Sequence, residues 1–204
     1  MRKLARRWIH FGAAGFVTLL SPESAKAHLV SSGLGPFYDG VTHLLVSPDD
    51  LLGVIALSLL AGLNSKGHGR HLLFLLPAAW IVGGSFGLLK TSEVQAPVAS
   101  AISFLVIGLL VATDVRLGRS ALFGLASAFG VFHGYLNGTL AAQEGLGSAG
   151  IAGIVVAVFV AVALLASVAA TLRVYWMRIA ARVAGSWITA IGMLMAGWAL
   201  KSGS

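Results

Sequence analysis

Cysteine is absent from this 204-residue sequence, and methionine occurs only four times. Without thiolates the chain can form neither an internal disulfide nor an iron–sulfur cluster nor a cysteine-ligated metal site. The methionines are scattered, so the sequence gives no sign of a methionine-lined copper(I) path. Any metal ion held by this chain must therefore meet imidazole, carboxylate or backbone oxygen.

Charged residues are also scarce: they make up 10% of the chain, whereas 57% of the residues are hydrophobic and the mean hydropathy is +0.90. This composition is typical of a polytopic membrane protein and leaves no room for a sizeable soluble domain. The formal charge of +7 does not indicate nucleic-acid binding, because the basic residues lie in the N-terminal segment and in short loops. We therefore predict an all-α integral membrane protein whose surroundings are the lipid bilayer.

The first 27 residues have the pattern of a cleaved signal peptide. Residues 2–7 include four basic residues, residues 11–20 are apolar, and residues 25–27 form the small-residue cleavage site Ala-Lys-Ala. The apolar part is too short to cross a bilayer. We predict that residues 1–27 are removed and that residues 28–204 form one membrane domain with its N-terminus outside the cytoplasm. Whether the new terminal residue, His28, binds a metal stays open.

Six apolar stretches follow and are predicted to be six transmembrane helices, covering residues 36–63, 72–89, 98–115, 121–142, 149–172 and 183–200. If the mature N-terminus is outside, the loops after the first, third and fifth helix face the cytoplasm. These loops carry seven basic residues, against two in the outer loops and tail. This asymmetry obeys the positive-inside rule and places both mature termini outside a bacterial inner membrane.

The first stretch contains four ionisable residues at its head: Asp39, His43, Asp49 and Asp50. Each ionisable group at membrane depth costs about 2.5–3.5 kcal/mol on insertion scales, so the group calls for a functional explanation. Pro48 followed by two acids is typical of a helix start, but a helix from there to residue 63 measures only about 24 Å, short of a hydrocarbon core of about 30 Å. We therefore predict a first span broken near Pro48, and such breaks often build ion sites. Capping and metal ligation explain the two acids at the break equally well.

The fourth stretch contains a second polar group, because His133 and Asn137 lie one helical turn apart on one face. The glycines at 130, 134 and 138 form a stripe that allows another helix to approach closely. With the predicted topology, the polar residues of the first and fourth spans lie at the same outer depth. This agreement favours a shared metal site, although His133 alone could also be a packed histidine bonded to a carbonyl group.

At these residues the chain resembles the HupE/UreJ family, hydrogenase- and urease-associated membrane proteins regarded as nickel permeases. Their first motif, His-x5-Asp-His after F-x-x-G, is matched here by residues 37–50, except that Asp50 stands at the second histidine. Their second motif, F-H-G-Y-A-H-G-x-E, is matched by residues 132–140, with Asn137 at the later histidine and Leu140 at the glutamate. The resemblance implies a signal peptide, six spans and a nickel-type permease whose site is richer in oxygen than the family pattern.

We predict from these observations a secondary transporter for a divalent transition-metal ion, not an enzyme, with the ion as cargo and no permanently bound cofactor. Nickel is the first expectation, and cobalt, zinc, iron(II) and manganese also suit such donors. One alternative is an intramembrane hydrolase that pairs Ser85 of the sequence GGSFG with His133; another is an accessory protein that binds a metal without moving it. The predicted metal-contacting residues are His43, Asp49, Asp50, His133, Asp39 and Asn137, with Pro48, Gly130, Gly134 and Gly138 as hinge and packing positions.

Overall fold

The computed structural model describes residues 32–64, 67–90, 92, 94–169 and 174–202. The predicted signal peptide lies outside these residues, and its cleavage stays a prediction. The described residues form seven helices and no strand, which confirms the all-α class. The helices are α2 (Pro36–Val46), α3 (Pro48–Asn64), α4 (His68–Leu88), α5 (Pro97–Ala112), α6 (Arg119–Gln143), α7 (Gly147–Ala169) and α8 (Tyr175–Ser202).

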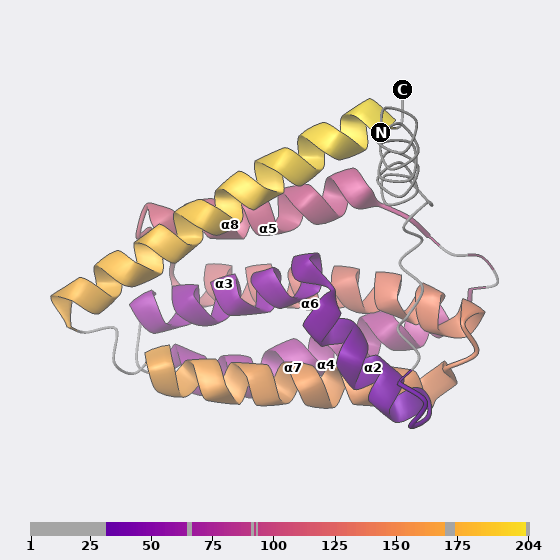
Figure 1. Ribbon diagram of the computed structural model, residues 1–204. Helices are drawn as coiled ribbons and strands as arrows, with labels where there is room; N and C mark the ends of the chain where they lie inside the picture. Colours follow the sequence, from indigo (N-terminus) through magenta and orange to yellow (C-terminus); the bar gives the residue numbers. More distant parts are fainter. Residues whose placement is uncertain (1–31, 65–66, 91, 93, 170–173, 203–204) are drawn as a thin grey trace, which may run out of the picture.

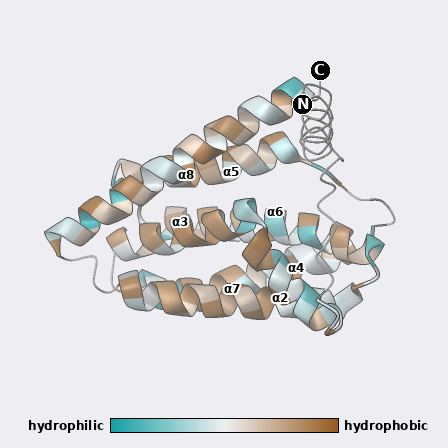
Figure 2. Ribbon diagram, in the orientation of Figure 1, coloured by the Kyte–Doolittle hydropathy of each residue, from teal (hydrophilic) through white to brown (hydrophobic). Residues whose placement is uncertain are grey.

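Three helices of the described chain, α4, α7 and α8, are long and apolar enough to cross a bilayer, and the bent pair of α2 and α3 makes a fourth candidate span. Helix α5 is apolar but has only 16 residues. Figure 2 shows long brown stretches along α7 and teal residues at the junction of α2 and α3. The chain thus has the apolar helices of a membrane protein, whereas six crossings stay a prediction.

The predicted break in the first span lies at Ser47, where α2 and α3 meet at an angle of 71° (Figure 1). The backbone N–H of Ser47 donates to the carbonyl of His43 over 2.9 Å and closes α2. Pro48 follows, and because proline has no N–H and a fixed φ, it cannot continue α2 but suits the first position of α3. The break therefore places the first turn of α3, with its two acids, inside the bundle.

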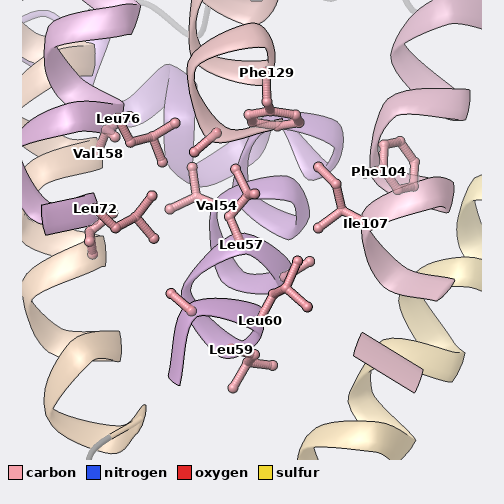
Figure 3. Close-up of a cluster of buried hydrophobic side chains, with 14 of the residues drawn as sticks. Val54, Leu57, Leu59, Leu60, Leu72, Leu76, Phe104, Ile107, Phe129 and Val158 are labelled. Atoms are coloured by element: carbon pink, nitrogen blue, oxygen red, sulfur yellow. The ribbon is translucent and has the colours of Figure 1, made fainter. Parts of the chain in front are cut away.

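Helix α3 is the centre of the hydrophobic core. Val54, Leu57 and Leu60 are fully buried along it. Figure 3 shows these side chains surrounded by Leu72 and Leu76 of α4, Phe104 and Ile107 of α5, Phe129 of α6 and Val158 of α7. A helix enclosed on all sides needs apolar residues around its whole circumference, as α3 has after its first turn. The core thereby fixes the direction in which the acids at the start of α3 point.

Helices α4 and α6 pack backbone against backbone through the glycine stripe of α6. A Cβ atom on Gly134 would lie 2.5 Å from the carbonyl oxygen of Trp80, and one on Gly138 would collide with the carbonyl oxygen of Gly84. Glycines at 83 and 87 of α4 meet the backbone of α6 in the same way. Close approach of this kind is typical of small-residue helix interfaces in membranes. It fixes the height of α6, and therefore of His133, relative to α4.

We expect Gly134→Ala to destabilise the fold, because the added methyl group meets a backbone carbonyl that cannot move aside; overpacking of this kind costs about 1–3 kcal/mol. The matched control is Gly124→Ala in the same helix, where a Cβ atom meets nothing within 4 Å. That change should stabilise α6 by about 0.5–1 kcal/mol. Thermal unfolding of the detergent-solubilised protein measures both, and equal midpoints for the two variants would contradict the packing argument.

Two helices begin before the membrane spans predicted within them. Helix α8 begins at Tyr175 rather than at residue 183, and α4 begins at His68 rather than at residue 72. Hydropathy marks the apolar part of a helix, whereas Arg178 and Arg182 belong to a helical turn that hydropathy cannot recognise. Arg178 donates to both carboxylate oxygens of Asp114 over 2.7 and 2.6 Å. This ion pair ties the end of α5 to the start of α8.

Candidate metal centre

The first turn of α3 and the middle of α6 bring three ligand-type side chains together. Donor atoms of Asp49, Asp50 and His133 all lie within 4.8 Å of one another. Asp50 and His133 are 4% and 1% exposed, whereas Asp49 is half-buried. A buried carboxylate beside a buried imidazole is the arrangement that a cation stabilises.

Asp50 makes its hydrogen bonds to another helix and not to the N-terminus of its own. Its Oδ1 atom lies 2.7 Å from Nδ1 of His133, and its Oδ2 atom accepts a hydrogen bond of 2.9 Å from Nδ2 of Asn137. A capping acid would instead accept from the free N–H groups of its own first turn. The contacts of Asp50 therefore favour a site between helices over a cap.

Asn137 connects His43 to Asp50. Because Nδ2 of Asn137 donates to the carboxylate, its Oδ1 atom faces Nε2 of His43 at 2.7 Å. An amide oxygen only accepts, so Nε2 of His43 must carry a proton and donate. The hydroxyl oxygen of Ser47 lies 3.3 Å from the ring nitrogens of His43. In this arrangement the imidazole of His43 orients Asp50 through Asn137.

Two serines of α5, which sequence reasoning missed, complete the site. The hydroxyl of Ser100 donates to Oδ2 of Asp49 over 2.8 Å, and the hydroxyl oxygen of Ser103 lies 2.8 Å from Nε2 of His133. Their signal in the sequence is the i,i+3 spacing of two hydroxyls on an otherwise apolar helix. The depth argument applied to the first and fourth spans would have placed them at the same level.

Aromatic rings close the site on the side of the core. The ring of Phe129 stacks on His133 at 4.1 Å between centroids, and the edge of Phe132 meets the same imidazole at 5.1 Å. Gly53 of α3 leaves the space that the Phe129 ring fills, because a Cβ atom there would collide with it. These rings hold the imidazole in one orientation and keep water away from its inner face.

Asp39 lies apart from the three-residue group. Its Oδ1 atom accepts hydrogen bonds from the backbone N–H and the hydroxyl of Ser32, over 2.5 and 2.6 Å. It shares a buried face of α2 with His43, one turn away. Of the six predicted metal-contacting residues, the structure thus groups three, links two to them by hydrogen bonds, and leaves Asp39 in a contact with the preceding segment.

The geometry suits a small divalent ion. Two ligands each about 2.1 Å from one ion stand about 3.0 Å apart when adjacent and about 4.2 Å apart when opposite. The donor atoms of Asp49, Asp50 and His133 lie up to 4.8 Å apart, so small rotations of the carboxylates would bring all three to ligand distance from one ion. Two carboxylates match the charge of a dication, and a neutral imidazole adds the borderline-soft nitrogen that nickel, cobalt and zinc accept.

Comparison with known families shows to which family the chain belongs. Residues 16–195 of the 204 match the family described as HupE / UreJ protein. The chain belongs to the HupE/UreJ family. No curated protein and no solved structure matches it. The match confirms the resemblance drawn from the two motifs. Members of the HupE/UreJ family are accessory or transport membrane proteins and not enzymes.

The hydrolase alternative is not supported in this HupE/UreJ protein. The nitrogens of His133 face Asp50 and Ser103, whereas Ser85 lies on an exposed face of α4. The flanking glycines at 83 and 87 pack against α6 inside a regular helix. A nucleophilic serine in a G-x-S-x-G motif needs a sharp strand-to-helix turn, which this helix does not provide.

Of the three positions that depart from the HupE/UreJ motifs, the two that replace histidines contact each other. Asp50 and Asn137 both stand where the family pattern has histidine, and Nδ2 of Asn137 donates directly to the carboxylate of Asp50. An aspartate in place of the family's histidine brings a carboxylate that needs a hydrogen-bond donor, and the side-chain amide of Asn137 supplies one. The two departures therefore form one matched pair.

Proposed function

We propose that this HupE/UreJ protein is a secondary permease that carries a divalent transition-metal ion, nickel first among the candidates, inward across the membrane. The observation that carries the proposal is the group of Asp49, Asp50 and His133 at the break in the first span. Charged groups inside a membrane bundle are costly and generally mark ion pathways. Broken helices near the middle of a bundle form the ion sites of many secondary transporters.

Burial increases along the proposed route. Asp49 is half-buried and Asp50, the next residue, is buried against His133. An ion arriving from the outer side would meet a hydrated carboxylate first and lose its water as it moves to Asp50. Carboxylate charge offsets the loss of hydration, so the ion can give up its water in steps.

The membrane potential is a sufficient driving force. Moving two positive charges through 100 mV supplies about 4.6 kcal/mol, which corresponds to an accumulation of about a thousandfold. The sequence contains no phosphate-binding glycine-rich loop of the G-x-x-x-x-G-K-[ST] type. We therefore propose transport powered by the potential or by an ion gradient.

Uptake into sealed vesicles tests the proposal against the alternative of an accessory protein that only binds metal. Purified protein in liposomes with an inside-negative potential should accumulate ⁶³Ni²⁺ beyond one ion per protein. Collapsing the potential without a protonophore should reduce the rate of ⁶³Ni²⁺ uptake. A signal that saturates at the amount of protein and ignores the potential would indicate binding alone. Co²⁺, Zn²⁺, Fe²⁺ and Mn²⁺ as competitors rank the cargo.

We also propose a bacterial inner-membrane location with both mature termini outside. Helices α4, α6 and α8 begin at the end of the bundle where α3, α5 and α7 finish (Figure 1), and Arg70, Arg116, Arg119, Arg178 and Arg182 belong to that end. Basic residues at one end favour a cytoplasmic position for it. A tag after Ser204 should be labelled by a membrane-impermeant reagent in intact spheroplasts; labelling only after lysis would contradict this orientation.

A further inference from the structure

The hydroxyl group of Ser103 has two polar neighbours, the carbonyl group of Ser100 and the imidazole of His133. The hydroxyl oxygen lies 2.7 Å from the carbonyl oxygen of Ser100, one turn earlier in α5. Two oxygens at this distance need a hydrogen between them, and a carbonyl brings none. The hydroxyl hydrogen of Ser103 is therefore donated to Ser100, and only lone pairs of its oxygen remain for other partners.

This leaves one assignment for the imidazole of His133. Its Nε2 atom lies 2.8 Å from the Ser103 oxygen, so Nε2 must carry the hydrogen and donate it. In the neutral ring Nδ1 then presents a lone pair, and this lone pair points at Oδ1 of Asp50, 2.7 Å away. Two such electron-rich atoms at this separation require a proton between them, and a metal ion that replaced this proton would bind both atoms at a separation of about 3.0 Å.

We propose that Ser103 is a positioning residue that commits His133 to bind the transported ion through Nδ1, between His133 and Asp50. The inference rests on the proposed function and deepens it, because it names the donor atom and gives α5 a role in the site. Hydrogen bonding of the remote ring nitrogen commonly fixes both the tautomer and the orientation of a ligating histidine. Here a serine that passes its own hydrogen to a helix carbonyl performs this function.

The experiment measures equilibrium binding of Ni²⁺ to the purified full-length protein in nanodiscs. Loss of a partner that orients a metal ligand costs about 10- to 100-fold in affinity, and we expect this loss for Ser103→Ala. Ser103→Thr should stay within about threefold of the wild type, because threonine in a helix makes the same hydroxyl bond to the carbonyl one turn earlier. The matched control is Ser58→Ala, since the buried Ser58 bonds only the carbonyl of Val54 in its own helix; its affinity should be unchanged.

The outcomes separate this inference from the proposed function. Wild-type affinity in Ser103→Ala, with Ni²⁺ binding intact in the wild type, would overturn the role of Ser103 alone. A wild-type protein that binds no Ni²⁺ would overturn the proposed function and this inference together. A direct readout is the ¹¹³Cd–¹⁵N coupling in Cd²⁺-loaded protein containing ¹⁵N-histidine: coupling to Nδ1 of His133 is expected, and coupling to Nε2 would refute the assignment.

Discussion

Asp50→Asn should abolish metal uptake while the protein remains folded and present in the membrane. Asparagine has the shape of aspartate, and its amide can still meet both Asn137 and His133. What disappears is the negative charge that offsets the dehydration of the ion. Removing a group that merely orients a metal ligand already lowers metal affinity about 10- to 100-fold. Loss of the ligand charge itself should therefore lower affinity and uptake at least about 100-fold. Ni²⁺ uptake into proteoliposomes, normalised to the protein incorporated, measures the effect.

The matched control for this change is Asp114→Asn at the other end of the bundle. It removes a carboxylate in the same way and breaks the ion pair with Arg178. The backbone of Asp114 has φ 53°, a left-handed conformation that asparagine also adopts readily. The two side chains of this pair are 25% and 23% exposed, so breaking the pair can lower abundance, but neither group belongs to the candidate metal centre and uptake normalised to the protein incorporated should stay near the wild-type level. Substantial uptake by Asp50→Asn would show that Asp50 is a cap or a structural acid and would remove it from the site.

The sequence predicts the break at the first span because local chemistry determines it. Pro48 removes a backbone donor, and the two acids suit the start of a new helix. The common depth of the site residues is also a sequence prediction, since the predicted topology puts His133 and the acids at one level. The structure brings them to within hydrogen-bonding distance, which the positive-inside rule alone could not establish.

The contribution of α5 was missed because serines in an apolar helix commonly bond their own backbone, so their spacing and depth indicate a level in the bundle but do not identify a long-range partner. Ser58 and Ser103 both bond carbonyls one turn earlier, yet only Ser103 also faces a histidine of another helix. The direction in which α5 faces depends on its packing against α3 and α8, which no local pattern encodes. The role of Asn137 as a bridge between His43 and Asp50 was missed for the same reason.

His43 and His133 should behave as one unit in a double-mutant cycle of uptake. His133→Ala removes a ligand and should cost at least about 100-fold, whereas His43→Ala removes the donor that holds Asn137 against Asp50 and should cost about 10- to 100-fold. The double variant should be little worse than His133→Ala, because both side chains act on the same carboxylate and coupled groups are not additive. Additive losses of uptake in the double variant would indicate that His43 and His133 act independently, in separate steps of transport.

His43→Gln then separates a positioning role from ligation at His43. The side-chain amide of glutamine can donate to Oδ1 of Asn137 as Nε2 of His43 does, but it lacks the imidazole lone pair that a nickel-type ion prefers. If His43 orients Asp50 through Asn137, His43→Gln should recover most of the uptake that His43→Ala loses, and Asn137→Ala should match His43→Ala. If His43 is itself a ligand, His43→Gln should be as poor as His43→Ala, and the relative uptake of Ni²⁺ over Mn²⁺ should fall because oxygen donors replace nitrogen.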